Sequence, residues 1–527
     1  MDGLDRGAAT VRESAARPSR RFAARVGAAR PRSAVALDAL IWAVALAGTA
    51  AWLRAGTNAR FGPLLGPVAA AARFAISPAY RRRVRDWSGR AWREVEAWAE
   101  GGGTLPWRAA LAFAAGPFFL FEAANGTQLG TFDTRPVVPT AVSLLRDGDV
   151  DLAEFEGLRP PLLRGPDGTS CYCFQVVDGC IVSTYPPGMV PFALAAVAPA
   201  YALGADLDST RTLQYLEKAT GSAVAALALG LFFLTATRLG STRGAVATTL
   251  FLATGSSLFT TVGLGLWQHG GVVAWLLAAL LVEFAARGEP GRRGTAFQGF
   301  ALAQMLSCRP TAALLFGVFG LWVLIRSPRR GLWLGLFGVL SLAPWQLFYW
   351  SVYHNLLGPA TINNHSTAAL WSFFALRPTL GVLFSPGRGI FVYQPWAILA
   401  VAGVVAWMLR AIRGRREVLA GPPGWRAFGL AAVTLHVVMI AAWWDWPGGY
   451  CYGSRLATDV VPLLALLATP AAAALAARRR GVALLGGLAL AAFLVHVPCV
   501  AFEAHRWNQV QPRDHWSWSH APFLYRR

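Results

Sequence analysis

The chain has 527 residues, of which 55% are hydrophobic and only 14% are charged, and its mean hydropathy is +0.43. A soluble protein of this length would carry far more charge, so the composition excludes a soluble protein and predicts a polytopic membrane protein. The formal net charge of +21 comes from short arginine clusters between apolar runs. This distribution excludes a nucleic-acid-binding protein and indicates control of membrane topology.

Residues 34–106 are predicted to hold one or two extra hydrophobic segments and an Arg-rich linker, after a basic tail, 1–33, that we expect to be disordered. No small-residue cleavage site follows the apolar run 34–53, so a cleaved signal peptide is not expected. Either this run pairs with 61–78 as a membrane hairpin, or it lies in the interface. The linker is predicted to be cytoplasmic because it carries Arg81, Arg82, Arg83, Arg85, Arg90 and Arg93.

Residues 107–501 are predicted to form a membrane domain of about eleven helices. Arginines mark each inward turn, and the long loops then fall on the outer side. The expected spans are 107–124, 221–237, 246–264, 271–287, 296–307, 310–325, 331–352, 390–410, 427–444, 456–476 and 481–501. The fold class is therefore an all-α polytopic membrane protein with an extracytoplasmic tail, 502–527. The Ala-, Arg- and Gly-rich composition indicates a bacterial plasma membrane.

The longest outer loop, 125–220, is expected to contain a hairpin and a surface helix. Asp178-Gly179 is a strong signal for a two-residue hairpin turn. Its register sets Cys180 opposite Val177 and Cys173 opposite Thr184, so the hairpin does not bridge these cysteines. The six cysteines are therefore not expected to form a disulfide framework, and their spacing fits no usual zinc site.

Residues 186–204 are apolar enough to cross the membrane, but we predict a helix along the outer surface. A crossing would place Arg238 and Arg243 on the outer side, against the positive-inside rule. Near the opposite surface, Glu283 lies at the inner end of its predicted span and is expected to reach toward the headgroups.

Asp133 is the candidate general base, because it opens the outer loop just beyond the first core span. A carboxylate that faces arginines at the membrane surface suits chemistry on a lipid-linked phosphate. Glu122, near the outer end of that span, is the second candidate for this role. Arg135 lies two residues further on and is a possible substrate contact.

Three arginines are candidate ligands for a donor phosphate. Arg455 follows a Gly-rich outer loop and is predicted to begin an inward helix, whose N–H groups favour an anion. Arg388 ends the previous outer loop in the same way, and Arg309 stands at the break before Pro310. A simpler reading pairs Arg455 with Asp459 four residues later and with lipid headgroups. The same loop contributes Asp445 and Tyr452 as possible substrate contacts.

The outward histidines could contact substrate or metal, although no pair of them has the spacing of metal ligands. They are His269, His354 and His365. Among them, His269 and His365 are kept as possible substrate contacts. From the residues alone, no metal site and no cofactor is predicted.

A set of short motifs between residues 107 and 501 resembles the GT-C membrane glycosyltransferases, such as protein O-mannosyltransferases and aminoarabinose transferases. The resemblance rests on the order of these motifs along the chain and on the membrane side where each is predicted to lie. The motifs are Phe132-Asp133-Thr134-Arg135, Leu144-Leu145-Arg146-Asp147-Gly148-Asp149, Tyr185-Pro186-Pro187-Gly188, Arg238-Leu239-Gly240, Arg309-Pro310, Ser385-Pro386-Gly387-Arg388-Gly389 and Gly453-Ser454-Arg455.

The resemblance implies a polyprenyl-phosphate sugar donor and an acceptor (glycan, lipid or protein) bound at the outer face. It implies inversion at the sugar, with Asp133 as the general base. Many relatives have two adjacent acidic residues at this point, whereas Thr134 follows Asp133 here, which leaves the use of a divalent metal open. The alternatives are a lipid or polysaccharide transporter without catalysis, and an O-antigen ligase or polymerase.

Overall fold

The structure is a computed structural model that describes residues 65–124, 132–158, 171–286, 288–361, 371, 375–413, 421–501, 507–508 and 514–525. The predicted basic tail, the apolar run 34–53 and His365 lie outside these residues. Most of the described chain is helical, and the expected all-α fold is confirmed at that level. One two-stranded sheet accompanies the helices.

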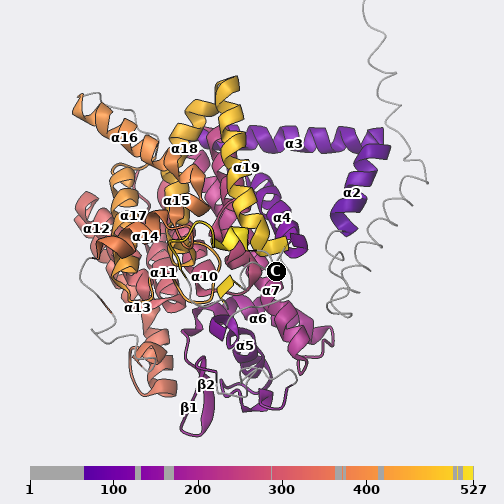
Figure 1. Ribbon diagram of the computed structural model, residues 1–527, viewed down its shortest axis with the longest axis vertical. Coiled ribbons are helices and arrows are strands. Elements are labelled where there is room, and N and C mark those ends of the chain that lie inside the picture. The colour runs from indigo at the N-terminus through magenta and orange to yellow at the C-terminus, as the bar shows by residue number, and fades with distance from the viewer. Residues whose placement is uncertain are drawn as a thin grey trace, which may run out of the picture.

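Each of the eleven predicted spans coincides with helical segments of one bundle (Figure 1). The segments of this bundle are α4 (Trp107–Ala124), α7 (Thr210–Thr237), α8 (Thr242–Thr254), α9 (Ser257–Thr260), α10 (Gln268–Ala285), α11 (Arg292–Cys308), α12 (Ala313–Arg326), α13 (Pro328–Tyr353), α14 (Leu376–Phe384), α15 (Ile390–Tyr393), α16 (Ile398–Ile412), α17 (Trp425–Ala442), α18 (Val461–Ala476) and α19 (Arg479–Ala501). Among the described residues, six helices are long and apolar enough to cross a membrane. The number of spans stays a prediction.

Two predicted spans are interrupted rather than straight. The span 246–264 breaks at Gly255, where α8 ends and the short helix α9 follows. A Cβ at Gly255 would lie 2.4 Å from the Ala492 Cβ of α19, so close helix packing requires glycine at this point. The span 390–410 breaks at Gln394, because Pro395 has no N–H to continue the helical ladder.

The outer loop forms a cap at one end of the bundle, made of α5 (Val137–Arg146), β1 (Phe174–Val177), β2 (Cys180–Ser183) and α6 (Val190–Ala202). The predicted hairpin is confirmed, with Val177 paired to Cys180. Asp178 and Gly179 both have positive φ, as a type I′ turn requires. The 13 residues of α6 reach about 20 Å, and α6 packs against α5 within this cap.

One disulfide is present, between Cys171 and Cys173, a pair that the sequence analysis did not single out. The two residues belong to a turn before β1, where their Cα atoms are 5.2 Å apart. That separation is within reach of a disulfide. The hairpin register alone could not reveal this bond, since it lies outside the paired strands.

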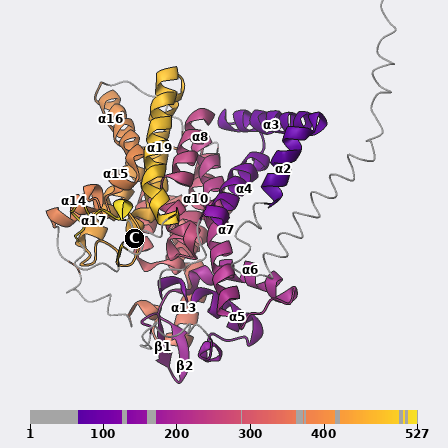
Figure 2. The same ribbon diagram turned by 45° about the vertical axis from the view of Figure 1, so that its right-hand side comes forward.

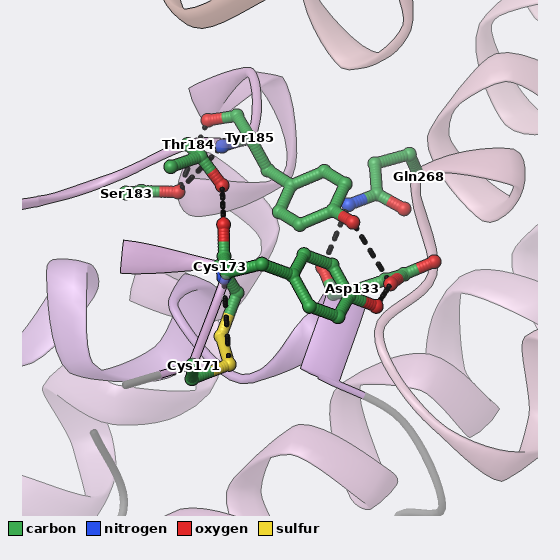
Figure 3. Close-up of a disulfide and its surroundings, with 8 residues drawn as sticks. Asp133, Cys171, Cys173, Ser183, Thr184, Tyr185 and Gln268 are labelled. Carbon is green, nitrogen blue, oxygen red and sulfur yellow. Dashed lines mark hydrogen bonds between the residues drawn. A yellow bond between two sulfur atoms is a disulfide. The ribbon is translucent and has the colours of Figure 1, made fainter. Parts of the chain in front are cut away.

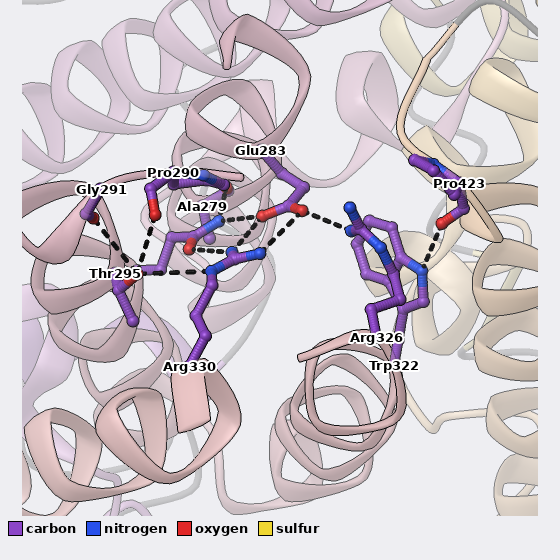
Figure 4. A network of polar contacts seen from close by, with 10 residues as sticks. Ala279, Glu283, Pro290, Gly291, Thr295, Trp322, Arg326, Arg330 and Pro423 are labelled. Atoms are coloured by element: carbon purple, nitrogen blue, oxygen red, sulfur yellow. Dashed lines mark hydrogen bonds and ion pairs between the residues drawn. The ribbon is translucent and has the colours of Figure 1, made fainter. Parts of the chain in front are cut away.

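Glu283 does not reach toward the headgroups, as its position had suggested. Its side chain is fully buried and accepts hydrogen bonds from Arg326, Arg330 and Gln298, and Figure 4 shows the two arginines converging on it. A buried carboxylate needs charged and polar partners to offset its lost hydration. The helices α10, α11, α12 and α13 bring these partners together, so Glu283 joins four helices instead of contacting lipid.

Candidate active site

Asp133 lies in the short 3-10 helix η3 (Phe132–Thr134), between α4 and the cap. Its Oδ1 accepts hydrogen bonds from the Tyr172 and Tyr185 hydroxyls, at 2.5 and 2.8 Å. Its Oδ2 accepts one from Arg455 Nη1 at 2.8 Å. The side chain is 16% exposed, so both oxygens are largely shielded from water. Figure 3 shows Tyr185 and Asp133 facing one another across the loop.

Arg455 reaches Asp133 from the start of η11 (Arg455–Asp459), 322 positions further along the chain. Gly453 before it has φ of 64°, and a Cβ there would lie 2.7 Å from the Tyr393 ring. The guanidinium stacks on Trp267 at 4.5 Å. Within the described residues, its buried Nε donates no hydrogen bond.

The expected pairing of Arg455 with Asp459 is not made, and the helix proper begins only at Val461. A short 3-10 segment therefore replaces the predicted helix N-terminus at Arg455. The anion-binding capacity of this residue rests on its guanidinium rather than on a helix dipole.

Asp133 is ionised in this arrangement. Burial by itself would raise the pKa of the carboxyl, but the charge of Arg455 and the hydrogen bonds from Tyr172, Tyr185 and Arg455 together hold the pKa below its usual value. Burial and the neighbouring carboxylate raise the pKa of both tyrosines. The phenols therefore stay protonated and act as hydrogen-bond donors.

A second charged pair lies beside the first and contains Arg309, another predicted phosphate ligand. Arg309 Nη1 donates to Asp459 Oδ2 at 2.7 Å, and the guanidinium side chain is 21% exposed. His269 Nδ1 lies 2.7 Å from Asp459 Oδ1, and His436 Nε2 lies 3.6 Å from Oδ2. Asp459 is fully buried, so these neighbours hold its charge in place.

The sequence Trp267-Gln268-His269 joins the two pairs at the N-terminus of α10. Trp267 lies under Arg455, and Gln268 Nε2 donates to the Asp133 carbonyl oxygen at 2.9 Å. His269 contacts Asp459. Three consecutive residues thus contact both charged pairs.

Arg388 is not brought to Asp133. It is 3% exposed and donates to the carbonyl oxygens of Pro447 and Gly449, at 2.7 and 3.1 Å, and to Asn508 Oδ1 at 2.6 Å. Its guanidinium therefore fixes the loop that leads to Arg455. Two other predicted contacts belong to this loop: Asp445 accepts from the Gly448 N–H with its carbonyl, and the buried Tyr452 donates to the Val495 carbonyl.

Glu122 and Arg135 lie near Asp133 in the chain, but no hydrogen bond or ion pair described by the structure links either to its carboxylate. Glu122 is buried, and its carbonyl oxygen accepts a hydrogen bond from Lys218, the only lysine of the chain, at 2.9 Å. Arg135 stacks on Phe132 at 4.2 Å and lies close to Glu217. His365 lies outside the described residues.

Several residues of the site were missed in the sequence. Tyr185 was taken as part of a rigid turn in Tyr185-Pro186-Pro187-Gly188, and Tyr172 carried no signal beyond its place between two cysteines. Asp459 was recognised only as a partner for Arg455. Among the described residues, no group of three or more His, Cys, Asp or Glu side chains is arranged to hold a metal ion.

No family model matches the chain, and none of the curated proteins matches it. Two solved structures are similar in fold. ArnT from Cupriavidus metallidurans, bound to undecaprenyl phosphate, has a TM-score of 0.48 and 15% identity, over 76% of this chain and 68% of that chain. The archaeal oligosaccharyltransferase AglB from Archaeoglobus fulgidus, in complex with an inhibitory peptide and a dolichol-phosphate, has a TM-score of 0.40 and 12% identity, over 79% of this chain and 53% of that chain.

The likeness is distant in each case, and neither match assigns an activity to this chain. Its function has to be argued from the geometry around Asp133.

Proposed function

We propose that this protein is a membrane glycosyltransferase that moves a sugar from a polyprenyl-phosphate donor to an acceptor hydroxyl at the extracytoplasmic face, with inversion. One observation carries the proposal: an ionised carboxylate, Asp133, lies in direct contact with the guanidinium of Arg455. The proposed base, Asp133, and a residue that can bind phosphate, Arg455, are therefore adjacent at one end of a helical bundle with membrane-type helices. The donor class is the one that the GT-C resemblance implies.

The transfer step uses Asp133 as the base. The acceptor hydroxyl takes the place of one tyrosine hydroxyl at Asp133 Oδ1, and its oxygen attacks the anomeric carbon from the side opposite the phosphate. The proton passes to the carboxylate while the bond between the anomeric carbon and the phosphate oxygen breaks. The electron pair leaves on the phosphate, and a single displacement inverts the configuration. A positioned base of this kind contributes roughly 10²–10⁴-fold to the rate.

Donor binding is what makes Asp133 a competent base. In the ligand-free site, Arg455 lowers the pKa of Asp133 and so weakens its basicity. A donor phosphate draws the Arg455 guanidinium toward itself, through the bidentate geometry that arginine offers. The carboxylate then loses part of the positive charge that stabilises it. Its pKa therefore rises toward the pKa of the acceptor hydroxyl. The donor therefore binds before the acceptor is activated.

The remaining arginines divide between binding and support. Arg309 is partly exposed beside Arg455 and supplies a second positive charge to the leaving phosphate, held in place by Asp459. Arg388 acts indirectly, since its donors already fix the loop that places Arg455. The proposed glycosyl transfer uses no metal ion.

The experiment is a transfer assay with the purified full chain in proteoliposomes. Undecaprenyl-phosphate carrying a radiolabelled hexose or pentose is the donor, and a set of glycan, lipid and peptide acceptors is offered. We expect a product with inverted anomeric configuration from the wild type and none from Asp133→Asn. A protein that moves the lipid-linked sugar across the bilayer without forming a product would be a transporter, and the proposal would be wrong.

A further inference from the structure

The helix α3 (Pro78–Ala99) carries one continuous apolar stripe that is only half covered by protein. The stripe follows helical spacing and consists of Tyr80, Val84, Trp87, Ala91, Val95 and Trp98. At its C-terminal end, Ala91, Val95 and Trp98 are buried against the bundle. Trp98 donates to the Leu234 carbonyl at 3.2 Å and stacks on Arg238 at 3.7 Å.

The N-terminal half of the same stripe extends away from the bundle. Trp87 is 39% exposed, although it continues the line of residues that the bundle buries further along. A tryptophan on an apolar stripe beyond the protein core is typical of a helix that lies in a membrane interface.

The helix α3 is strongly positive between residues 81 and 93. Between residues 81 and 93 the helix carries six arginines and a single acidic residue, Asp86. Five of the arginines are exposed, namely Arg82, Arg83, Arg85, Arg90 and Arg93. At 100° per residue, Arg83 and Arg90 border the stripe on one side, whereas Arg82 and Arg93 lie on the opposite face of the helix.

The position of α3 in the fold matches a membrane surface. Figures 1 and 2 show it at the end of the bundle away from the hairpin, where it projects outward from the bundle, with α2 (Leu65–Ile76) turning down from its far end. Ser77 caps the corner between them by accepting from the Tyr80 N–H. The helix α4 then leads from α3 toward Asp133, and its 18 residues span about 27 Å. This length is close to the thickness of a bilayer core.

We propose that α3 is an interfacial helix that binds anionic phospholipid headgroups, on the membrane face opposite the Asp133 site. The exposed part of the stripe, centred on Trp87, enters the interface, and Arg83 and Arg90 contact the headgroup phosphates. The buried part of the same stripe couples this contact to α7. The inference does not depend on the proposed glycosyl transfer.

The first test measures depth, with the full chain in nanodiscs. A fluorophore is attached through Trp87→Cys or Gly89→Cys, each in a Cys180→Ser background, since Cys180 is the exposed free cysteine. We expect brominated lipid to quench the label at position 87 and not the label at position 89, which lies on the opposite face. Equal protection of both labels from quenching would overturn the proposal. Quenching at position 87 that appears only after residues 1–64 are deleted would also overturn it, because that segment would then be the occupant.

The second test measures lipid preference by native mass spectrometry of the purified chain. Phosphatidylglycerol should bind more tightly than phosphatidylcholine, and the double variant Arg83→Gln/Arg90→Gln should weaken its binding by roughly fivefold per arginine. The double variant Arg82→Gln/Arg93→Gln removes the same charge from the opposite face and should have a smaller effect. An equal loss of phosphatidylglycerol affinity in both double variants would mean that the lipid responds only to the overall positive charge of α3. That result would contradict the proposal.

Discussion

Replacement of Asp133 by Asn should separate catalysis from donor binding. The amide keeps the size of the side chain but takes no proton, so turnover should fall by the ~10²–10⁴-fold that a positioned base contributes. The amide oxygen still accepts the hydrogen bonds from Tyr172 and Tyr185, now 2.5 and 2.8 Å long. The NH₂ group replaces Oδ2, which lies 2.8 Å from Arg455 Nη1, and that ion pair is lost.

The lost pair has two measurable consequences. The Arg455 side chain is 12% exposed, so an unpaired guanidinium at this place should cost about 1–3 kcal/mol of folding stability. The same guanidinium is then free for the donor phosphate. Affinity of the variant for undecaprenyl-phosphate sugar should therefore equal or exceed that of the wild type, although turnover is lost.

The assay combines initial rates with a direct measurement of donor affinity, on wild type, Asp133→Asn and a matched control, Glu122→Gln. Glu122 is buried nearby without a hydrogen bond described to Asp133, so the control should keep most of its turnover. Turnover of Asp133→Asn within tenfold of the wild type would refute the proposed mechanism. Full activity in Asp133→Asn with none in Glu122→Gln would move the role of base to Glu122.

Four further outcomes are expected. Arg455→Lys should weaken donor binding nearly as much as Arg455→Ala, since lysine lacks the bidentate fork, and the dissociation constant of the donor measures this. Arg388→Ala should lower the melting temperature before it changes the chemistry, because it removes hydrogen bonds to Pro447, Gly449 and Asn508; a properly folded variant with a specific loss of donor binding would return Arg388 to the phosphate site. The pKa of Asp133 is lowered in the folded state, so its contribution to stability is complete above about pH 4 and is lost as pH falls through the lower folded pKa. Acid unfolding followed by circular dichroism should show that wild type and Asp133→Asn become more similar in their free energy of unfolding as the pH falls below this value. EDTA should leave the transfer rate unchanged, and a rate restored only by added Mg²⁺ or Mn²⁺ would contradict the metal-free step.

The positions of the helices could be predicted because they depend on local properties of the chain. An apolar run long enough for a bilayer forms a helix wherever it lies in the bundle, and arginine clusters mark its ends. Asp178-Gly179 determined the hairpin for a similar reason, since its two positive φ angles belong to the turn alone. Asp133 became a candidate because of its place just beyond a span, and Arg455 because of the glycines before it.

The partners of these residues were decided only by the tertiary structure. Arg455 pairs with Asp133 across 322 positions of sequence, although Asp459 lies four residues away. Arg388 looks like Arg455 in the sequence, yet the fold directs its guanidinium to backbone carbonyls of the loop. Glu283 became a buried ion-pair partner because four helices converge on it. A charged side chain pairs with the group that the packing of distant helices places within about 3 Å of it. Sequence spacing and composition do not predict which group that is.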